Sequence, residues 1–285
     1  MESFLRAHFR KGVIWLAVFV LFTLLVKVID VKAIGPEDTK VGFAALNGFV
    51  FRIIGQHEFF EKLTKILGYI ALLTAAGFAA VGVMQFLKTK SLKDVDGEII
   101  LLGVFYVIVL LAYVFFELCV VNYRPVILDE GIEASYPSSH TVLVICIFAT
   151  APGMIYRLTM NKQLYTVSKY ACYAVIAVMV IGRLISGVHW FTDIIGGILL
   201  SAALVYFFNG AMEYFGAEPL PDAGEEKKLL QFPIKLPVKL PVKLPSVSAG
   251  GRSAAAGSHS AHSAPEDDAP AQKKNSGGGG AHLAK

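Results

Sequence analysis

The stretch GRLISGVHWFTD, residues 182–193, places three ionisable side chains between two strongly apolar runs. They are Arg183, His189 and Asp193, at spacings of six and four residues. An ionisable side chain at membrane depth costs about 2.5–3.5 kcal/mol on insertion scales, so such groups usually face a polar cavity and indicate function. The stretch therefore predicts a membrane protein in which two spans meet at a polar site.

The composition extends this prediction to most of the chain. The 285 residues are 55% hydrophobic and have a mean hydropathy of +0.60, which is too apolar for a soluble globular protein. A helix needs about 20 apolar residues to cross a bilayer. Six runs are predicted to do so: residues 13–28, 66–87, 99–120, 138–156, 166–186 and 191–212. The predicted fold class is all-α, a polytopic bundle of six transmembrane helices.

The basic residues beside these runs predict the orientation of the chain, because short cytoplasmic segments carry an excess of lysine and arginine. The clusters before the first run and after the second and fourth runs are Arg6, Arg10 and Lys11; Lys88, Lys90 and Lys93; and Arg157 with Lys162. With six spans, these clusters share one side with both termini. That side is predicted to be the cytoplasm. The net charge of +4 is small for a chain of this length and indicates no nucleic-acid partner.

Residues 1–213 are predicted to form one membrane domain. Within it, residues 42–63 have apolar side chains at helical spacing but are too polar to span the bilayer. Two interpretations are open. The segment is either an amphipathic helix that lies at the outer interface or a helix that packs on the outer ends of the spans.

Residues 214–285 are rich in Gly, Ala, Ser, Pro and Lys, and this composition is typical of a disordered tail. Proline at every fourth position of a short repeat favours an extended strip rather than a helix. Its lysines, Lys235, Lys239 and Lys243, are spaced to contact anionic inner-leaflet lipids. The alternative interpretation is a stiff, solvated linker.

Two further motifs accompany the opening stretch. In NYRP, residues 122–125, the proline biases Arg124 away from the helical region, so the chain turns at the end of the third span. In YPSSH, residues 136–140, a proline and two serines open the fourth span, and a helix N-terminus offers amides to anions. His189 and Asp193 share one helical face. On the predicted topology all three motifs emerge on the outer side of the membrane.

These motifs resemble those of the type 2 phosphatidic acid phosphatase (PAP2) family. The family pattern is Lys-x6-Arg-Pro, then Pro-Ser-Gly-His, then Ser-Arg-x5-His-x3-Asp. This chain matches it at Arg124-Pro125, at Pro137-Ser138 with His140, and from Arg183 to Asp193. The resemblance covers the third to the sixth span.

The resemblance implies a reaction and a set of roles. His189 is expected to attack phosphorus and form a phosphohistidine, while Asp193 holds its other ring nitrogen. His140 is expected to act as the general acid that protonates the leaving group. The groups expected to bind the phosphate oxygens are Arg124, Arg183, Ser138 and Ser139. The scheme needs no metal and no other cofactor.

This chain departs from the family pattern at three positions. Ser139 stands where the family has glycine, and Gly182 where it has serine. Glu117 stands where the family has its phosphate-binding lysine, and no lysine occurs between residues 94 and 161. Either Glu117 pairs with Arg124, or it selects a substrate with a cationic or hydroxylated head group.

Four aromatic residues flank the motifs, namely Tyr123, Tyr136, Trp190 and Phe191. They are predicted to lie in the interfacial belt. Tyr123 is, with Glu117, also a candidate for substrate selectivity.

The sequence thus predicts an integral membrane phosphatase that acts on a lipid phosphate at the outer face of the cell membrane. The substrate classes are an isoprenoid diphosphate and a glycerolipid phosphate, and neither the individual lipid nor the oligomeric state is indicated. Two alternatives remain. One is a catalytically impaired member of the family that binds lipid phosphate as a scaffold, and the other is an anion transport path.

Overall fold

A computed structural model describes residues 2–128, 131–217 and 220–221. Six of its helices are long and apolar enough to cross a membrane, within these described residues. They are α1 (Glu2–Val28), α3 (Glu58–Thr89), α4 (Gly97–Leu118), α5 (Ser139–Thr159), α6 (Lys162–Ser186) and α7 (Phe191–Tyr214). The six predicted spans and the all-α fold class are confirmed. Almost all of the predicted tail, with its lysine repeat, lies outside the described residues.

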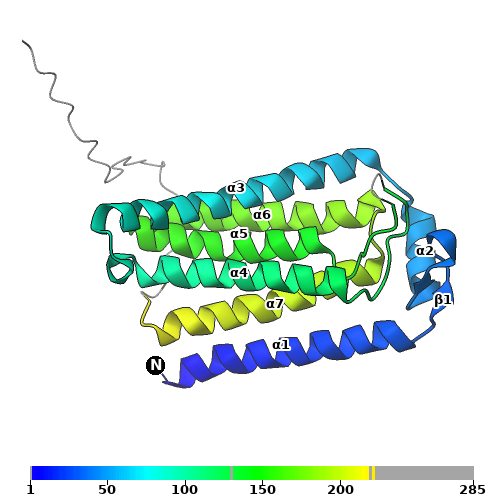
Figure 1. The fold of residues 1–285 in the computed structure, drawn as a ribbon, viewed down its shortest axis with the longest axis horizontal. Helices are drawn as coiled ribbons and strands as arrows, with labels where there is room; N and C mark the ends of the chain where they lie inside the picture. Colours follow the sequence, from blue (N-terminus) through cyan, green and yellow to red (C-terminus); the bar gives the residue numbers. More distant parts are fainter. Residues whose placement is uncertain (1, 129–130, 218–219, 222–285) are drawn as a thin grey trace, which may run out of the picture. The chain divides into compact units, whose positions relative to one another are not determined.

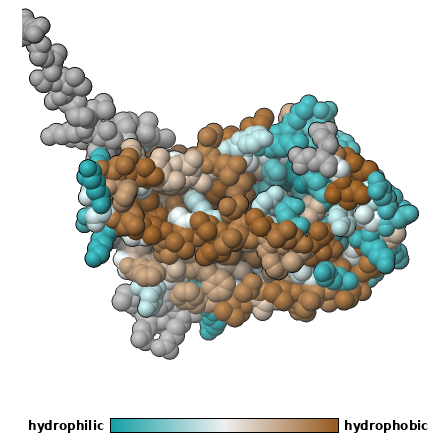
Figure 2. Space-filling model, viewed as in Figure 1, coloured by the Kyte–Doolittle hydropathy of each residue, from teal (hydrophilic) through white to brown (hydrophobic). Residues whose placement is uncertain are grey.

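The helices run alongside one another as a bundle (Figure 1). α5 packs against α3, α4, α6 and α7, while α1 packs against α7. Accordingly, 67% of the most apolar 18-residue stretch of α5 is buried inside the protein. The corresponding share is 17% in α1, α3 and α6. Figure 2 shows the outer side chains of the bundle as a broad hydrophobic belt, with hydrophilic residues gathered at its ends. α5 is therefore the protein-facing centre, and the peripheral helices present apolar side chains outward.

A short cap covers one end of the bundle. It consists of β1 (Lys32–Ala33), paired antiparallel with β2 (Lys40–Val41) and joined to it through a 3-10 turn (Pro36–Asp38), followed by α2 (Ala44–Ile54). A second 3-10 turn, Leu92–Asp94, links α3 to α4 at the opposite end (Figure 1). The cap lies at the end where α4 meets α5 and α6 meets α7.

The predicted amphipathic segment 42–63 is divided in the structure. α2 ends at Ile54, and residues from Glu58 onward already belong to α3. Asn47 is fully buried and bonds to α7, because its Nδ2 donates to Thr192 Oγ1 over 2.9 Å and its Oδ1 accepts from the Thr192 amide over 3.1 Å. Leu46, Phe49 and Ile53 are exposed on the other face of α2. The helix therefore packs on the end of a span and also presents an apolar face.

Candidate active site

The three sequence motifs lie at the capped end of the bundle, opposite the N-terminus (Figure 1). NYRP follows the end of α4 at Leu118, YPSSH leads into α5 at Ser139, and the third motif spans the turn from α6 to α7. Hydrogen bonds join all three, since Arg124 reaches His189 and the Ser138 amide donates to the Asp193 carbonyl over 3.0 Å. Residues separated by up to about 70 positions therefore form one polar cluster.

His189 is at the centre of this cluster and is 3% exposed. Its Nε2 lies 2.7 Å from Arg183 Nη2 and 3.3 Å from Arg124 Nη1, while its Nδ1 lies 3.1 Å from the Ser135 carbonyl oxygen. A guanidinium group can only donate, so Nε2 carries the lone pair and Nδ1–H donates to Ser135. This is the tautomer that a nucleophilic Nε2 requires.

The surroundings of His189 also fix its charge. Burial is the main cause that lowers the pKa of His189 well below its usual value, and the positive charges of Arg183 and Arg124 lower it further. A protonated imidazole would be desolvated and would face two cations. The ring is therefore neutral at physiological pH, with its lone pair directed at the two guanidinium groups.

Asp193 is fully buried and lies beside His189. Its Oδ2 is 3.8 Å from His189 Nδ1 and accepts a hydrogen bond from the Trp190 amide over 2.9 Å. Its Oδ1 accepts from Asn122 Nδ2 over 3.2 Å. Asp193 therefore also caps the start of α7 and ties Asn122 to it. The Ser135 carbonyl provides the short contact to His189.

Arg124 has a carboxylate partner that sequence reasoning missed. Its Nε lies 2.7 Å from Glu133 Oε2, and its amide donates to the Glu133 carbonyl over 3.1 Å. Among the described residues no ion pair within 4 Å joins Arg124 to Glu117. The direct ion pair of Arg124 is therefore with Glu133 and not with Glu117. Pairing through Nε leaves the Nη1 atom of Arg124 directed at His189.

Arg183 is a buried cation, 1% exposed. Its Nη1 donates to Thr64 Oγ1 on α3 over 3.3 Å, and its Nη2 donates to His189. No ion pair with a carboxylate is found for it within the described part of the chain. A buried charge is costly unless it is paired, so this arrangement favours an anionic ligand beside His189.

Gly182 explains one departure from the family pattern. A Cβ atom at this position would lie 2.8 Å from Thr64 Cγ2, closer than such contacts occur. A serine would therefore push α3 away from α6 at the point where Thr64 contacts Arg183. The glycine leaves room for the close packing of Thr64.

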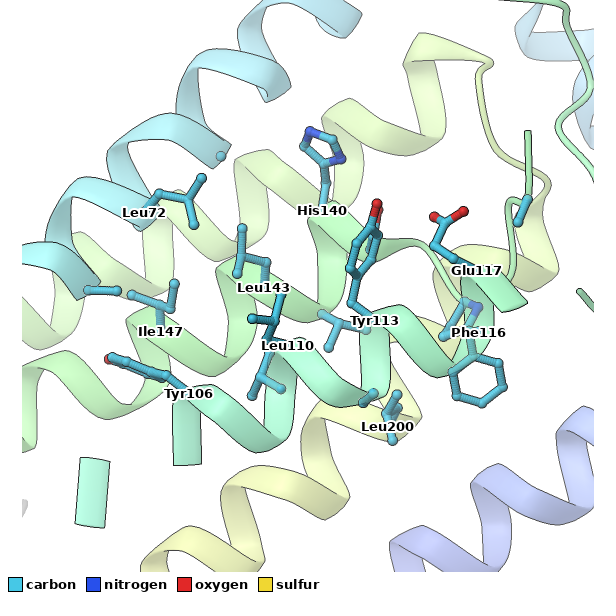
Figure 3. A pocket seen from close by; sticks show the side chains of 18 of the residues that line it. Leu72, Tyr106, Leu110, Tyr113, Phe116, Glu117, His140, Leu143, Ile147 and Leu200 are labelled. Carbon is cyan, nitrogen blue, oxygen red and sulfur yellow. The ribbon is translucent and has the colours of Figure 1, made fainter. Parts of the chain in front are cut away.

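A cavity of about 560 Å³ lies beside the cluster, between α3, α4 and α5. Figure 3 shows the polar ends of Tyr113, Glu117 and His140 on one side of it. The apolar lining includes Leu72, Tyr106, Leu110, Leu143, Ile147 and Leu200. One polar end and a long apolar wall suit an amphiphilic molecule.

His140 and Ser139 both line this cavity. His140 Nδ1 is buried and has no hydrogen-bond partner within the described residues. Ser139 is the first residue of α5. The first backbone hydrogen bond of the helix runs from the Val142 amide to the Ser138 carbonyl. Ser138 is fully buried, and its hydroxyl accepts from Thr141 Oγ1 over 3.0 Å. Of the two serines expected to bind phosphate, Ser139 is the one that faces the cavity.

The aromatic residues beside the motifs differ from the belt prediction. Trp190 is 2% exposed and donates from Nε1 to the Tyr123 carbonyl over 2.7 Å. Tyr136 is 1% exposed, and its hydroxyl shares a 2.8 Å hydrogen bond with Thr23 on α1. The belt prediction is therefore wrong for these two buried rings. Tyr123 is half-buried and is not among the residues that line the cavity.

The model of the PAP2 superfamily matches residues 102–217 of the chain. This segment begins within α4, ends just after α7 and includes all three motifs. This part of the chain is therefore similar to the PAP2 superfamily. The six long apolar helices among the described residues make the chain a multi-pass membrane protein.

The fold is similar to the crystal structure of a transmembrane PAP2-type phosphatidylglycerolphosphate phosphatase from Bacillus subtilis, with a TM-score of 0.49 and 16% identity. That comparison covers 72% of this chain and 96% of the other. No curated protein matches the chain.

The PAP2 match does not include the residues that α3 contributes to the cluster. Thr64, which contacts Arg183, precedes the matched segment by a wide margin. Sequence reasoning also missed Ser135 and Glu133. Both lie in the α4–α5 connection, where an isolated antiparallel bridge between Tyr123 and Ala134 brings them beside Arg124. No periodicity signals such a bridge in a loop.

Proposed function

We propose that this PAP2 protein hydrolyses a lipid phosphate or diphosphate through a phosphohistidine intermediate on His189. The observation that carries the proposal is the neutral His189, whose Nε2 faces two guanidinium groups beside an apolar cavity that His140 lines. A nucleophile, cations for a phosphate group and room for a hydrocarbon chain occur together in this arrangement.

The reaction proceeds in two steps. His189 Nε2 attacks phosphorus, the bond from phosphorus to the leaving oxygen breaks, and His140 donates a proton to that oxygen. Water then attacks the phosphohistidine while His140 accepts its proton, and inorganic phosphate leaves with His189 regenerated. Nδ1–H donates to the Ser135 carbonyl throughout, which stabilises the positive charge that the ring gains on attack.

Arg124 and Arg183 bind the non-bridging oxygens. Phosphoryl transfer is accelerated mainly by positioning and by electrostatic stabilisation of those oxygens. The first amides of α5 provide further donors at the cavity, next to Ser139.

The substrate class follows from the surroundings of the site. The cavity wall consists of residues from spanning helices, so a hydrocarbon chain reaches it from the bilayer. An isoprenoid diphosphate and a glycerolipid phosphate both have such a chain. Basic residues cluster at the α3–α4 and α5–α6 connections, which favours a cytoplasmic position for the end of the bundle where these connections lie. The three motifs lie at the opposite end. Hydrolysis is accordingly proposed at the outer face of the membrane.

Phosphate release by the detergent-purified protein tests the proposal. The substrates are phosphatidate, phosphatidylglycerophosphate and undecaprenyl diphosphate, each with a chelator present. His189→Ala is expected to abolish release and to prevent formation of an acid-labile phosphoprotein. His57→Ala, which changes an exposed histidine outside the cluster, is the matched control. Folded wild-type protein that releases no phosphate would instead support the scaffold alternative.

A further inference from the structure

One face of α3 forms a wall of the site. Glu61, Thr64, Lys65 and Gly68 follow the helical spacing that puts residues on one face. Thr64 contacts Arg183, and a Cβ atom at Gly68 would lie only 3.1 Å from His140 Cδ2. The backbone of α3 therefore approaches His140 closely, in a part of the chain outside the PAP2 match.

Lys65 lies on this face, between the two contact points. It lines the cavity together with Ser139, His140 and Glu117, and it is the one lysine or arginine among the described residues that do so. The polar end of the cavity is thus formed by a cation from α3, a carboxylate from α4 and a histidine from α5.

The ion pair of Lys65 is one that an anionic ligand can replace. Its Nζ lies 2.7 Å from Glu61 Oε1, and its side chain remains 48% exposed while that of Glu61 is 12% exposed. The lysine head group sits on a flexible stem with three donors, so it can contact a second acceptor beside Glu61 or turn away from it. Glu61 then acts as the resting counter-ion.

We propose that Lys65 binds the phosphate of a lipid substrate whose hydrocarbon chain occupies the cavity. The inference rests on the proposed function. Without Lys65, the carboxylate of Glu117 would leave the polar end of this cavity negatively charged and unfavourable to a phosphate. Lys65 provides from α3 a positive charge at the same cavity that Glu117 of α4 lines.

A matched pair of lysines on α3 allows a sharp test. Lys62 forms the same kind of pair with Glu58, at 2.6 Å with i,i+4 spacing, but it does not line the cavity. Lys65→Met is expected to lower kcat/KM for phosphatidate roughly ten- to hundred-fold, the range for losing a hydrogen bond to a charged group. Lys62→Met is expected to leave it within about two-fold, as for an exposed pair.

Two further variants separate phosphate binding from a structural role. Lys65→Arg is expected to retain most activity, because it keeps the charge. Glu117→Lys is expected to restore activity to the Lys65→Met protein, because it places a cation on the same cavity. Inhibition by inorganic phosphate, measured on each folded variant, should weaken in Lys65→Met and recover in the double variant.

The outcomes distinguish this inference from the function on which it rests. If His189→Ala abolishes release while Lys65→Met and Lys62→Met behave alike, the function stands and the role of Lys65 is refuted. Equal phosphate inhibition of Lys65→Met and wild type would also refute it. Full activity in His189→Ala would overturn the proposed function itself.

Discussion

Arg183 Nη2 lies 2.7 Å from His189 Nε2, so a buried guanidinium group contacts the nitrogen proposed to attack phosphorus. Arg124 Nη1 contacts the same nitrogen at 3.3 Å. For attack to occur, both guanidinium groups must exchange Nε2 for the phosphate oxygens. The same contacts that hold the lone pair in the resting site thus place both cations where negative charge develops during transfer.

Arg183→Lys is expected to lower kcat by about 10²–10³, the effect of removing one donor from a transition-state site. An ammonium keeps the charge but cannot reproduce the planar fork that reaches both Thr64 and His189. Phosphate release under saturating substrate measures the effect. Arg52→Lys changes an exposed arginine on α2 and is expected to behave as wild type. Comparable activity in the two variants would remove Arg183 from the mechanism.

The low pKa of His189 predicts a pH dependence of stability. In the unfolded chain this histidine takes up a proton near pH 6.5, whereas burial and the two arginines keep it neutral in the folded protein. The unfolded state then binds more protons, so the free energy of unfolding falls as the pH drops below about 6.5, by at most about 1.4 kcal/mol per pH unit. Above that pH the contribution is constant.

Thermal unfolding in detergent from pH 5 to 8 measures this dependence. The difference between wild type and His189→Ala isolates the contribution of this histidine, since the other groups titrate in both. Wild type is expected to lose stability more steeply than the variant on the acid side. The substrate phosphate itself ionises near pH 6, so unfolding is a cleaner measurement than activity. Parallel curves would mean that His189 titrates normally in the folded protein.

The six spans were predictable because hydropathy depends on local composition, and the ends of α5, α6 and α7 lie within a few residues of the expected positions. The cluster of Arg124, His140 and His189 followed from the motifs. The partners of these residues did not. Ser135 and Glu133 are positioned by an irregular loop, and Thr64 reaches Arg183 only because Gly182 lets two helices approach. Such contacts depend on tertiary packing, which a linear pattern does not encode.

Glu133→Gln is expected to raise KM for a lipid phosphate about five-fold. The ion pair through Nε orients Arg124, and a partly exposed pair of this kind contributes about 1 kcal/mol. Glu117→Gln should leave the binding of inorganic phosphate by Arg124 undiminished, because Glu117 is not its partner. Inhibition constants for inorganic phosphate compare the two variants. Weaker phosphate binding in Glu117→Gln than in Glu133→Gln would show that the carboxylate partner of Arg124 has been misassigned.

Gly182→Ser restores the serine of the PAP2 pattern and is nevertheless expected to be harmful. The new Cβ would meet Thr64 Cγ2 at 2.8 Å, and overpacking of this kind typically costs about 1–3 kcal/mol. Movement of Thr64 would also disturb its contact with Arg183, so both the unfolding temperature and kcat/KM should fall. Gly77→Ser, at a position on α3 with no atom within 4 Å of the added Cβ, is the control.

Thr64→Ser provides the decisive companion to this variant. It deletes the methyl group that the Gly182→Ser Cβ would strike and keeps the hydroxyl that accepts from Arg183. The double variant should therefore regain most of the stability and activity that Gly182→Ser loses. If Thr64→Ser gives no recovery, the loss has a different cause and Gly182 is not explained by its contact with α3. Recovery would show that Gly182 allows the close packing of α3 against the buried Arg183.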